Sequence, residues 1–402
     1  MNLYADRAAI ADAAQANSIT NAMLAPMAAN GFKGQSAGGG NVQDLTPTQA
    51  TAALNAFSGD SGVGGAKGLV PAPAAGDAAA GKVLGAAGGW VAPSAFLGAT
   101  NPGGRLTLQA GVPFMPTTQA AQTVVYYAPY VHGYVPIYDG STFSARKFIS
   151  GPTDTTGLAL TLGSNWPPNT IHDVFVTMNA GVPTLCTVQW TNSTTPADTL
   201  ARYNGILTNA GAETCRTSNT ATISLAVNQG TFLGAIKTDG AASSVSWTYG
   251  GLASGGSLGA FQVWNQYNRI LTSSYNFDTG AAYTYTSTTV RFARGSGNNA
   301  IGILVGRMED AFYATYQQNT QTVAVAGATT QSGICIDTNV VSAGTETVAP
   351  TANAFKAGMN ITWAQRIVPG FHNVFACEQG DGANANSWAV YGGAQLIVVF
   401  PM

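Results

Sequence analysis

The sequence predicts a mainly β protein: an extended N-terminal arm with short helices, followed by two antiparallel β domains of the sandwich or jelly-roll type. Three observations lead to this fold class. The chain has 49 glycines among its 402 residues, and only 8% of its residues are charged. Beyond residue 105, short β-type runs alternate with turns of Gly, Pro, Asn and Asp. Since a soluble domain carries charge on roughly a quarter of its residues, we expect a subunit of an assembly.

The first 25 residues form the first predicted helix. Apolar residues recur there at roughly helical spacing, and no glycine or proline interrupts the run before Pro26. Most of this stripe is alanine, so it is too thin to form a core alone but can pack closely against another chain. The larger side chains are the ones that we expect to attach the chain to its assembly: Leu3, Ile10, Met23 and Leu24.

The remainder of the arm, which together with this helix spans residues 1–104, is dominated by Gly, Ala and Pro. Such a segment cannot bury enough apolar surface to fold independently. It contains one clear element, because Thr46 can cap a helix that begins at Pro47 and has Gln49 three residues after the cap. We predict about three helical turns there. The apolar face of this helix consists of Ala50, Ala53, Leu54 and Phe57.

Residues 105–270 are predicted to form the first β domain. Turn signals recur about every 8 to 12 residues, as in compact antiparallel domains. The expected strands have the sequences RLTLQAGV, TVVYYAPYV, VPIYDGSTF, HDVFVTMN, TLCTVQW, ATISLAV and GTFLGAIKT.

Residues 271–402 are predicted to form a second, jelly-roll-like β domain. Its last run, AQLIVVFPM, is almost wholly apolar, so we expect a central strand that is buried on both faces and neighbours the first strand of the domain. Residues 307–317 fit either a helix or a strand and turn. The other expected strands are YTYTSTTVRFA, AIGILVGR, TQTVAVAG, MNITWAQRI and HNVFACEQ.

Charge and cysteine content limit the classes of partner. The formal net charge is −2, which creates no basic field for nucleic acid. The N-terminus has charges where an export signal needs an apolar core, and no run reaches the roughly 18 apolar residues of a membrane-spanning helix. The four cysteines are far apart, so we expect buried thiols, with a Cys186–Cys215 bridge as the open alternative.

Residues 24–93 carry a recognisable pattern. The stretch MLAPMAANGFKGQSAGGGNVQDLTPTQATAALNAF, followed by KGLVPAPAAGDAAAGKVLGAAGGWVAP, resembles the arm of tail-fibre and appendage proteins of tailed bacteriophages. In that family the pattern runs from a KGN-TG-like segment through DLT..Q....L to KGLVPAP and a Gly-Trp. One departure is that Ala86-Ala87-Gly88-Gly89-Trp90 replaces an Asp-Gly-Thr-Trp, so attachment and ligand can differ. The matching positions are Lys33-Gly34, Asp44-Leu45-Thr46, Gln49, Leu54, Lys67-Gly68-Leu69-Val70-Pro71 and Gly89-Trp90.

The following module resembles the same appendage proteins. RLTLQAGVPFMPTTQAAQTVVYYAPYVHGYVPIYDGSTF is similar to its entry, and HDVFV, GTFLGAIKT and WNQYNRI are similar to later pieces. The resemblance implies a structural role in the virion and a homotrimer. Three copies would also bury the thin apolar stripes that one arm leaves exposed.

One run of the sequence matches the pattern of a hydrolase nucleophile. The run from Gly255 to Gly259 matches G-x-S-x-G around Ser257, and Asp278 and His372 follow in the order of a hydrolase triad. A nucleophile elbow needs a helix after the serine, whereas here a β-type run follows. We therefore interpret the match as a Gly/Ser-rich loop.

Paired carboxylates would be needed in a polysaccharide-cleaving spike. The available acids are Glu309 with Asp310 and Glu378 with Asp381, and no solenoid repeat positions them. We interpret them as solvated surface acids.

Metal and phosphate sites are not supported either. The three histidines, His132, His172 and His372, lack the spacing of metal ligands, and the run from Gly295 to Gly302 lacks the Lys-Ser/Thr of a phosphate loop. We predict no catalytic residue, no cofactor and no metal.

Aromatic residues in the last domain are the candidates for ligand binding. Trp363, Trp388 and Tyr391 lie near the loop GDGANANSW and could form a flat platform for sugar rings. Core packing or a trimer interface remains the alternative for each.

The function predicted from the sequence is that of a non-enzymatic, homotrimeric phage tail fibre. Its N-terminus is expected to bind other virion proteins, and its C-terminal domain a host surface glycan or protein. It would be made in the bacterial cytoplasm and reside on the particle surface. A head fibre or capsid decoration protein is the alternative, and a capsule-degrading tail spike is a third class.

Overall fold

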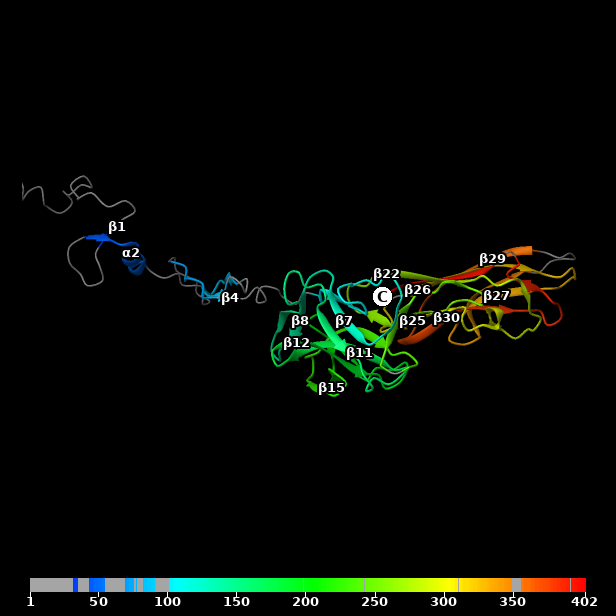
Figure 1. Cartoon of the computed structure of the whole chain (residues 1–402), viewed down its shortest axis with the longest axis horizontal. Helices are drawn as coiled ribbons and strands as arrows, with labels where there is room; N and C mark the ends of the chain where they lie inside the picture. The colour runs from blue at the N-terminus through cyan, green and yellow to red at the C-terminus, as the bar shows by residue number, and fades with distance from the viewer. Residues whose placement is uncertain are drawn as a thin grey trace, which may run out of the picture. The chain divides into compact units, whose positions relative to one another are not determined.

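The computed structural model describes residues 32–34, 43–54, 69–75, 77, 82–91, 101–197, 199–241, 243–309, 311–348, 356–390 and 392–402. The chain divides into two compact units, residues 1–96 and residues 97–402. Strands dominate the larger unit, which confirms the mainly β fold class (Figure 1). The predicted helix over residues 1–25, with its four attachment candidates, lies outside the described residues.

The first part of the small unit is a hairpin followed by a helix. Strand β1 (Phe32–Gly34) pairs antiparallel with β2 (Gln43–Leu45), and helix α2 (Pro47–Ala53) follows. The predicted capping box is confirmed, because the Gln49 backbone N–H donates to Thr46 Oγ1 and the Thr46 N–H donates to Gln49 Oε1 at 2.9 Å. The helix has 7 residues instead of the predicted three turns. The helix has no acidic side chain in its first turn and no basic one in its last turn, so it lacks the charges that would stabilise a longer helix through the helix dipole.

A second hairpin closes the small unit. Strands β3 (Val83–Leu84) and β4 (Trp90–Val91) pair antiparallel. The Trp90 indole N–H donates to the Pro71 carbonyl at 2.9 Å, and Lys82 Nζ lies 2.6 Å from an Asp77 carboxylate oxygen. These contacts connect residues that the sequence separates by up to 19 positions.

Three larger sheets contain most of the strands in residues 97–402. In spatial order, the β11 sheet consists of β13 (Leu200–Tyr203), β14 (Ile206–Asn209), β17 (Thr231–Lys237), β11 (Ile171–Asn179), β12 (Val182–Gln189), β15 (Glu213–Arg216) and β16 (Thr222–Leu225), with β21 (Val263–Asn265) paired to β17. The β30 sheet consists of β28 (Val341–Val348), β27 (Thr330–Ile336), β30 (Gly370–Gln379), β25 (Ala300–Val305), β20 (Gly259–Phe261), β18 (Val245–Thr248) and β6 (Gln119–Gln122), with β24 (Arg291–Phe292) paired to β30. The β26 sheet consists of β19 (Leu252–Ala253), β22 (Leu271–Asp278), β32 (Ala394–Pro401), β26 (Ala311–Gln321), β31 (Ser387–Trp388) and β23 (Tyr283–Thr284), with β29 (Lys356–Arg366) paired to β26.

Smaller elements complete the unit. One sheet has the order β10 (Leu158–Thr161), β7 (Val124–Pro129) and β5 (Gly104–Thr107), and one hairpin is β8 (Tyr134–Tyr138) with β9 (Phe143–Lys147). A short 3-10 turn, η3 (Ala293–Gly295), follows β24.

The β30 sheet crosses the domain boundary predicted at residue 270. Its strands β6, β18 and β20 precede that position and β25, β27, β28 and β30 follow it. One contiguous hydrophobic core includes residues from both sides. Buried Arg105 on β5 also donates from Nη2 to the carbonyl of Met402 at 2.9 Å, which joins the first strand to the last residue. Residues 97–402 therefore form a single unit (Figure 1).

The β26 sheet packs against the β30 sheet. The rings of Phe400 on β32 and Phe261 on β20 are 4.9 Å apart, and Gln318 on β26 donates to the Ser332 hydroxyl on β27. Within the β26 sheet, β32 is central between β22 and β26, as predicted from its apolar sequence. It is buried on one face only, because its alternate residues from Gln395 to Pro401 are half-buried. The expectation of burial on both faces is therefore wrong.

The ambiguous segment 307–317 is a turn followed by the strand β26 and not a helix. Alternate residues Phe312, Ala314 and Tyr316 face the core, and this two-residue period is that of a strand. Within the described chain, no helix is long and apolar enough to cross a membrane.

All four cysteines form disulfides. Cys186 on β12 is bonded to Cys215 on β15, and Cys335 on β27 is bonded to Cys377 on β30. Each cysteine is fully buried. The open alternative of a Cys186–Cys215 bridge is confirmed, and the expectation of free thiols is wrong for both pairs.

Candidate functional site

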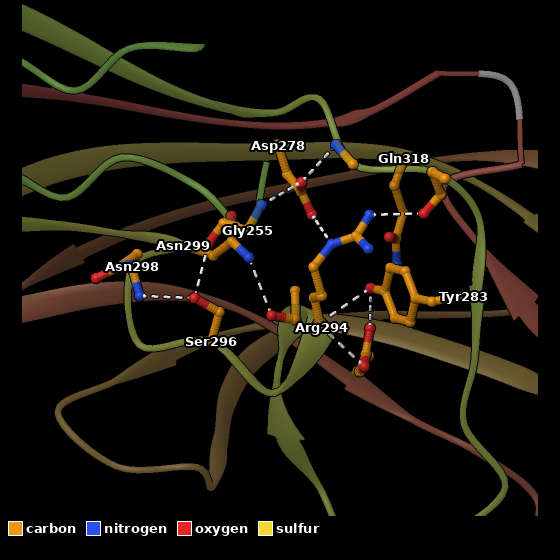
Figure 2. A network of polar contacts seen from close by, with 12 residues as sticks. Gly255, Asp278, Tyr283, Arg294, Ser296, Asn298, Asn299 and Gln318 are labelled. Carbon is orange, nitrogen blue, oxygen red and sulfur yellow. Dashed lines mark hydrogen bonds and ion pairs between the residues drawn. The ribbon is translucent and has the colours of Figure 1, made fainter. Parts of the chain in front are cut away.

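A buried polar network lies between the β26 and β30 sheets (Figure 2). The Arg294 guanidinium, carried by η3, contacts Asp278 of β22 with Nε 2.6 Å from Oδ2. Figure 2 shows this side chain beside the ring of Tyr283, whose hydroxyl donates to Glu378 Oε2. Arg291 Nε donates to Glu378 Oε1 at 2.6 Å. The network thus links the last residue of β22 to β23, β24 and β30.

Both carboxylates of the network are withdrawn from solvent. The side chains of Asp278 and Glu378 are 2% and 0% exposed. Burial raises the pKa of Glu378, although Tyr283 and Arg291 oppose this shift with hydrogen bonds and positive charge. Burial also raises the pKa of the Tyr283 hydroxyl well above its ordinary value. A general acid needs a carboxyl group with a raised pKa. Among the described acids, Glu378 with Asp278 is therefore the best candidate pair for hydrolysis of a glycosidic bond.

The hydrogen bonds of the network favour a structural role. Asp278 Oδ1 accepts from the backbone N–H groups of Gly255 and Gly280, each at 2.8 Å, while Oδ2 accepts from Arg294. Both Glu378 oxygens are also hydrogen-bonded. Since every carboxylate oxygen has an internal partner, the network holds the loops around β22 instead of presenting an acid to a substrate.

The G-x-S-x-G match is part of the same loop anchorage. The Ser257 N–H donates to Asn276 Oδ1 at 3.2 Å, and Asn276 Nδ2 donates back to the Ser257 carbonyl at 2.9 Å. Strand β20 follows the serine, so the helix of a nucleophile elbow is absent from this described segment. The ring nitrogens of His372 contact Asp337 and the carbonyl of Val368 at 2.7 and 2.9 Å. The structure thus does not assemble Ser257, Asp278 and His372 into a triad.

The remaining acidic candidates serve other contacts. Glu309 is paired with Arg202, Arg269 and Arg307. Asp310 lies outside the described residues. Among the described residues, no group of three or more His, Cys, Asp or Glu side chains gathers to hold a metal ion.

Asp381 organises the loop before β31. Burial would raise the pKa of Asp381, but hydrogen bonds from the backbone and side chains of this loop lower it well below the ordinary value. Its Oδ2 accepts from the Asn386 amide and from the Thr329 N–H, both at 2.9 Å. It is therefore a structural acid and not a partner of Glu378.

The three predicted aromatic residues do not form a platform among the described residues. Trp388 is 0% exposed and stacks on Tyr283, with ring centroids 6.3 Å apart, so it offers no face to a ligand. Trp363 is half-buried and packs edge-on against Phe312 at 5.3 Å. Tyr391 lies outside the described residues.

An open groove on the outer face of the β26 sheet was not predicted. It encloses about 420 Å³, and none of its described lining residues is charged. The strands β26, β29 and β32 contribute the amide side chains of Gln317, Asn319, Asn360 and Gln395, and Phe277 of β22 lies beside them. We call it the amide groove. In the sequence these residues are spread over more than 110 positions, so only the strand pairing reveals them.

The same sheet face is apolar next to the amide groove. Leu271, Tyr275 and Tyr313 are 67%, 42% and 54% exposed, and the half-buried Ile397 and Val399 lie between them. We call these five residues the apolar face. Contiguous exposed apolar residues on a sheet commonly mark a protein–protein contact.

Comparisons with known proteins give little guidance. No family model and no curated protein matches the chain. The solved structure of the infectious bursal disease virus Gx strain is 12% identical, over 76% of this chain and 70% of that one, with a TM-score of 0.21. An exo-β-1,3-galactanase from Phanerochaete chrysosporium is 10% identical, over 75% and 69%, with a TM-score of 0.13. Neither likeness is close enough to support an argument about fold or function.

Proposed function

We propose that the chain is a non-catalytic structural subunit of a bacteriophage particle, a homotrimeric tail fibre that attaches the particle to its host cell. The observation that carries the proposal is the division of the chain at residue 96. The segment that resembles phage appendage arms, residues 24–93, falls wholly inside the small unit. The β unit that follows it supplies the body of the fibre.

The contacts of the small unit support the resemblance. Positions that match the appendage pattern pair with one another: Lys33 Nζ lies 2.7 Å from Asp44 Oδ1, and Gln49 closes the capping box with Thr46. Gly34 packs against Leu45, since a Cβ at Gly34 would lie 2.6 Å from Leu45 Cδ1. The matching positions therefore make contacts with one another in this chain, which supports the proposal.

The trimer is supported by apolar surface that one copy leaves uncovered. In the small unit, Phe32 and Leu54 are 61% and 60% exposed and line an apolar groove of about 410 Å³. The hairpin and helix described over residues 32–54 are too small to bury enough surface to be stable alone. In the β unit, the apolar face offers a second surface for self-association.

The non-catalytic assignment is supported by how the ionisable residues are used. The acids that the sequence offered for catalysis and that the structure describes, Asp278, Glu309, Glu378 and Asp381, are each engaged in internal pairs or hydrogen bonds. The amide groove has no charged side chain among its described lining. Binding without bond cleavage is the activity that such a surface supports.

The test is inhibition of adsorption. Antibodies raised against residues 97–402 should block adsorption of the phage that encodes the chain, and the purified protein should release no reducing sugar from the host capsule. Particles that lack the chain would contradict the virion assignment. Release of reducing sugar would contradict the non-catalytic one, and adsorption that the antibodies leave intact would contradict the attachment role.

A further inference from the structure

The strand register places three amides of the amide groove in one row and the fourth in the next row. Gln317 on β26 is paired with Gln395 on β32 on one side and with Asn360 on β29 on the other. Directly opposed side chains on one face of an antiparallel sheet lie about 5 Å apart. Asn319 follows two residues after Gln317 and therefore points to the same face. Four amides thus converge on a surface a few strands wide.

Two of these amides, those of Asn319 and Gln395, retain unused hydrogen-bonding capacity. Among the described residues, the side chains of Asn319 and Gln395 have no hydrogen-bond partner, although both residues are half-buried. Gln317 makes one long contact, from Nε2 to Asn360 Oδ1 at 3.5 Å. Each amide offers two N–H donors and a carbonyl acceptor. The groove therefore presents donors and acceptors of both kinds at close range.

Glycines keep the groove open beside an aromatic ring. Gly393 has φ +116°, and a Cβ there would lie 2.6 Å from the ring of Phe277. At Gly392 a Cβ would meet nothing within 4 Å, and at Gly358 it would meet only Asn319 Oδ1, at 3.3 Å. An apolar ring next to amides matches a sugar, which has an apolar C–H face and a rim of hydroxyl groups that both donate and accept.

We propose that the amide groove binds a neutral oligosaccharide. The proposal rests on the proposed attachment function and deepens it by naming the class of ligand. The volume of the amide groove, about 420 Å³, lies within the range of small-ligand sites, roughly 300 to 1,000 Å³. The absence of charge from its described lining favours a neutral sugar over an acidic one. Three copies of a weak site in one trimer would raise the avidity for a surface that repeats the same sugar.

The test is binding of the full chain to immobilised oligosaccharides: maltohexaose, cellohexaose, chitohexaose and a β-1,3-galactan oligomer, with polygalacturonate as the acidic comparison. We expect binding to a neutral member that does not fall between about 0.05 and about 0.5 M NaCl, since no charge pair is screened. The double variant N319A/Q395A should weaken it about tenfold or more, because two amide hydrogen bonds are lost.

The matched control is Q365A, which removes an exposed amide from the same strand, β29, outside the groove. It should leave binding unchanged, and light scattering should show all variants with the same mass. Binding to no neutral member, equal binding by N319A/Q395A, or binding to polygalacturonate alone would overturn the proposal. A changed mass for N319A/Q395A would show that a second copy covers the groove, which also overturns it. Failure here with intact antibody inhibition of adsorption would leave the attachment function standing.

Discussion

Glu378 is a charged residue used as a structural one. Its carboxylate is fully buried and is held by Tyr283 and Arg291, while Arg294 joins the same network through Asp278. Removing the Glu378 carboxylate leaves the buried Tyr283 hydroxyl and the half-buried Arg291 guanidinium without their shared partner. We expect the variant E378A to lose about 3 to 5 kcal/mol of unfolding free energy, measured by urea denaturation.

The control for this prediction is E309A. Glu309 is 25% exposed, and its arginine partners are 21% to 55% exposed, so solvent screens their interaction. We expect a loss of about 1 kcal/mol or less. Equal losses in the two variants would contradict the account of the buried network.

His172 gives the protein a pH-dependent stability. Burial, with a smaller contribution from the positive charge of Arg216, lowers its pKa to about 4, and its Nε2 lies 2.8 Å from Thr170 Oγ1. The folded protein therefore keeps His172 neutral while the unfolded chain binds a proton below about pH 6.5. This group lowers the unfolding free energy as the pH falls from about 6.5 to about 4 and has no effect above that window.

We expect the H172Q variant to lose less stability than the wild type between pH 7 and pH 5, by about 2 kcal/mol. Urea denaturation at the two pH values measures this difference. The same comparison between pH 7 and pH 8 is the control, where the two proteins should respond alike. A pH dependence that H172Q leaves unchanged would show that other groups govern acid stability.

Individual side chains were the least predictable level of the structure. The sequence suggested that Trp388 faces a ligand, but β23 brings Tyr283 against it and covers it. The sequence alone indicates a surface acid at Glu378, because its arginine partner, Arg291, lies 87 positions away. The sequence around each residue does not predict either contact, since both contacts depend on strand pairing between distant segments. The Thr46 capping box was predictable because all of its atoms lie within four consecutive residues.

At the scale of elements, the two disulfides join neighbouring strands. The Cys186–Cys215 bridge closes a separation of 29 residues between β12 and β15. Restricting the unfolded chain over such a loop contributes about 3 to 4 kcal/mol. We expect the double variant C186A/C215A to lose about that much unfolding free energy in urea denaturation under oxidising conditions.

The matched control is reduction. After treatment with dithiothreitol, this double variant and the protein that retains both cysteines should have similar unfolding free energies. A thiol titration of the untreated, denatured protein should find no free cysteine. Four reactive thiols in protein purified from particles would contradict the disulfide assignment.

Strand β22 shows why the sequence predicts strands better than their orientation. Its inward residues are the polar Thr272, Ser274, Asn276 and Asp278, and its outward residues include the apolar Leu271 and Tyr275. A two-residue period identifies the strand, but hydrophobicity alone assigns its faces in reverse. Ser274, Asn276 and Asp278 are hydrogen-bonded to residues 250–257 and to Arg294 of η3. Those partners become visible only once the sheet is formed.

At the scale of the whole molecule, the apolar face is expected to hold copies together. Tyr275 and Tyr313 lie on adjacent rows of the outer sheet face and are 42% and 54% exposed. Two lysines there would place like charges in a desolvated contact. We expect the Y275K/Y313K variant to lose the trimer mass in light scattering, while V182K, at a site 60% exposed on β12, keeps it. A monomeric wild type, or a trimer that Y275K/Y313K preserves, would contradict this assignment.

The large-scale organisation was predictable where it depends on composition. The change from a Gly- and Ala-rich arm to β-type runs near residue 105 lies close to the division at residue 96. The boundary proposed at residue 270 has no such compositional change, and strands from both sides share the β30 sheet. A single sequence does not show which strands, far apart along the chain, will pair in the same sheet.

The central claim is that the chain is a tail fibre fixed to the particle by its N-terminus. The most direct measurement is electron microscopy of phage particles whose copies of the chain carry a gold label at residue 1. The account predicts three labels per fibre at the junction of fibre and tail, with residues 97–402 projecting away from the particle. Labels on the capsid would indicate a head fibre or decoration protein and contradict the claim, as would particles that carry no label.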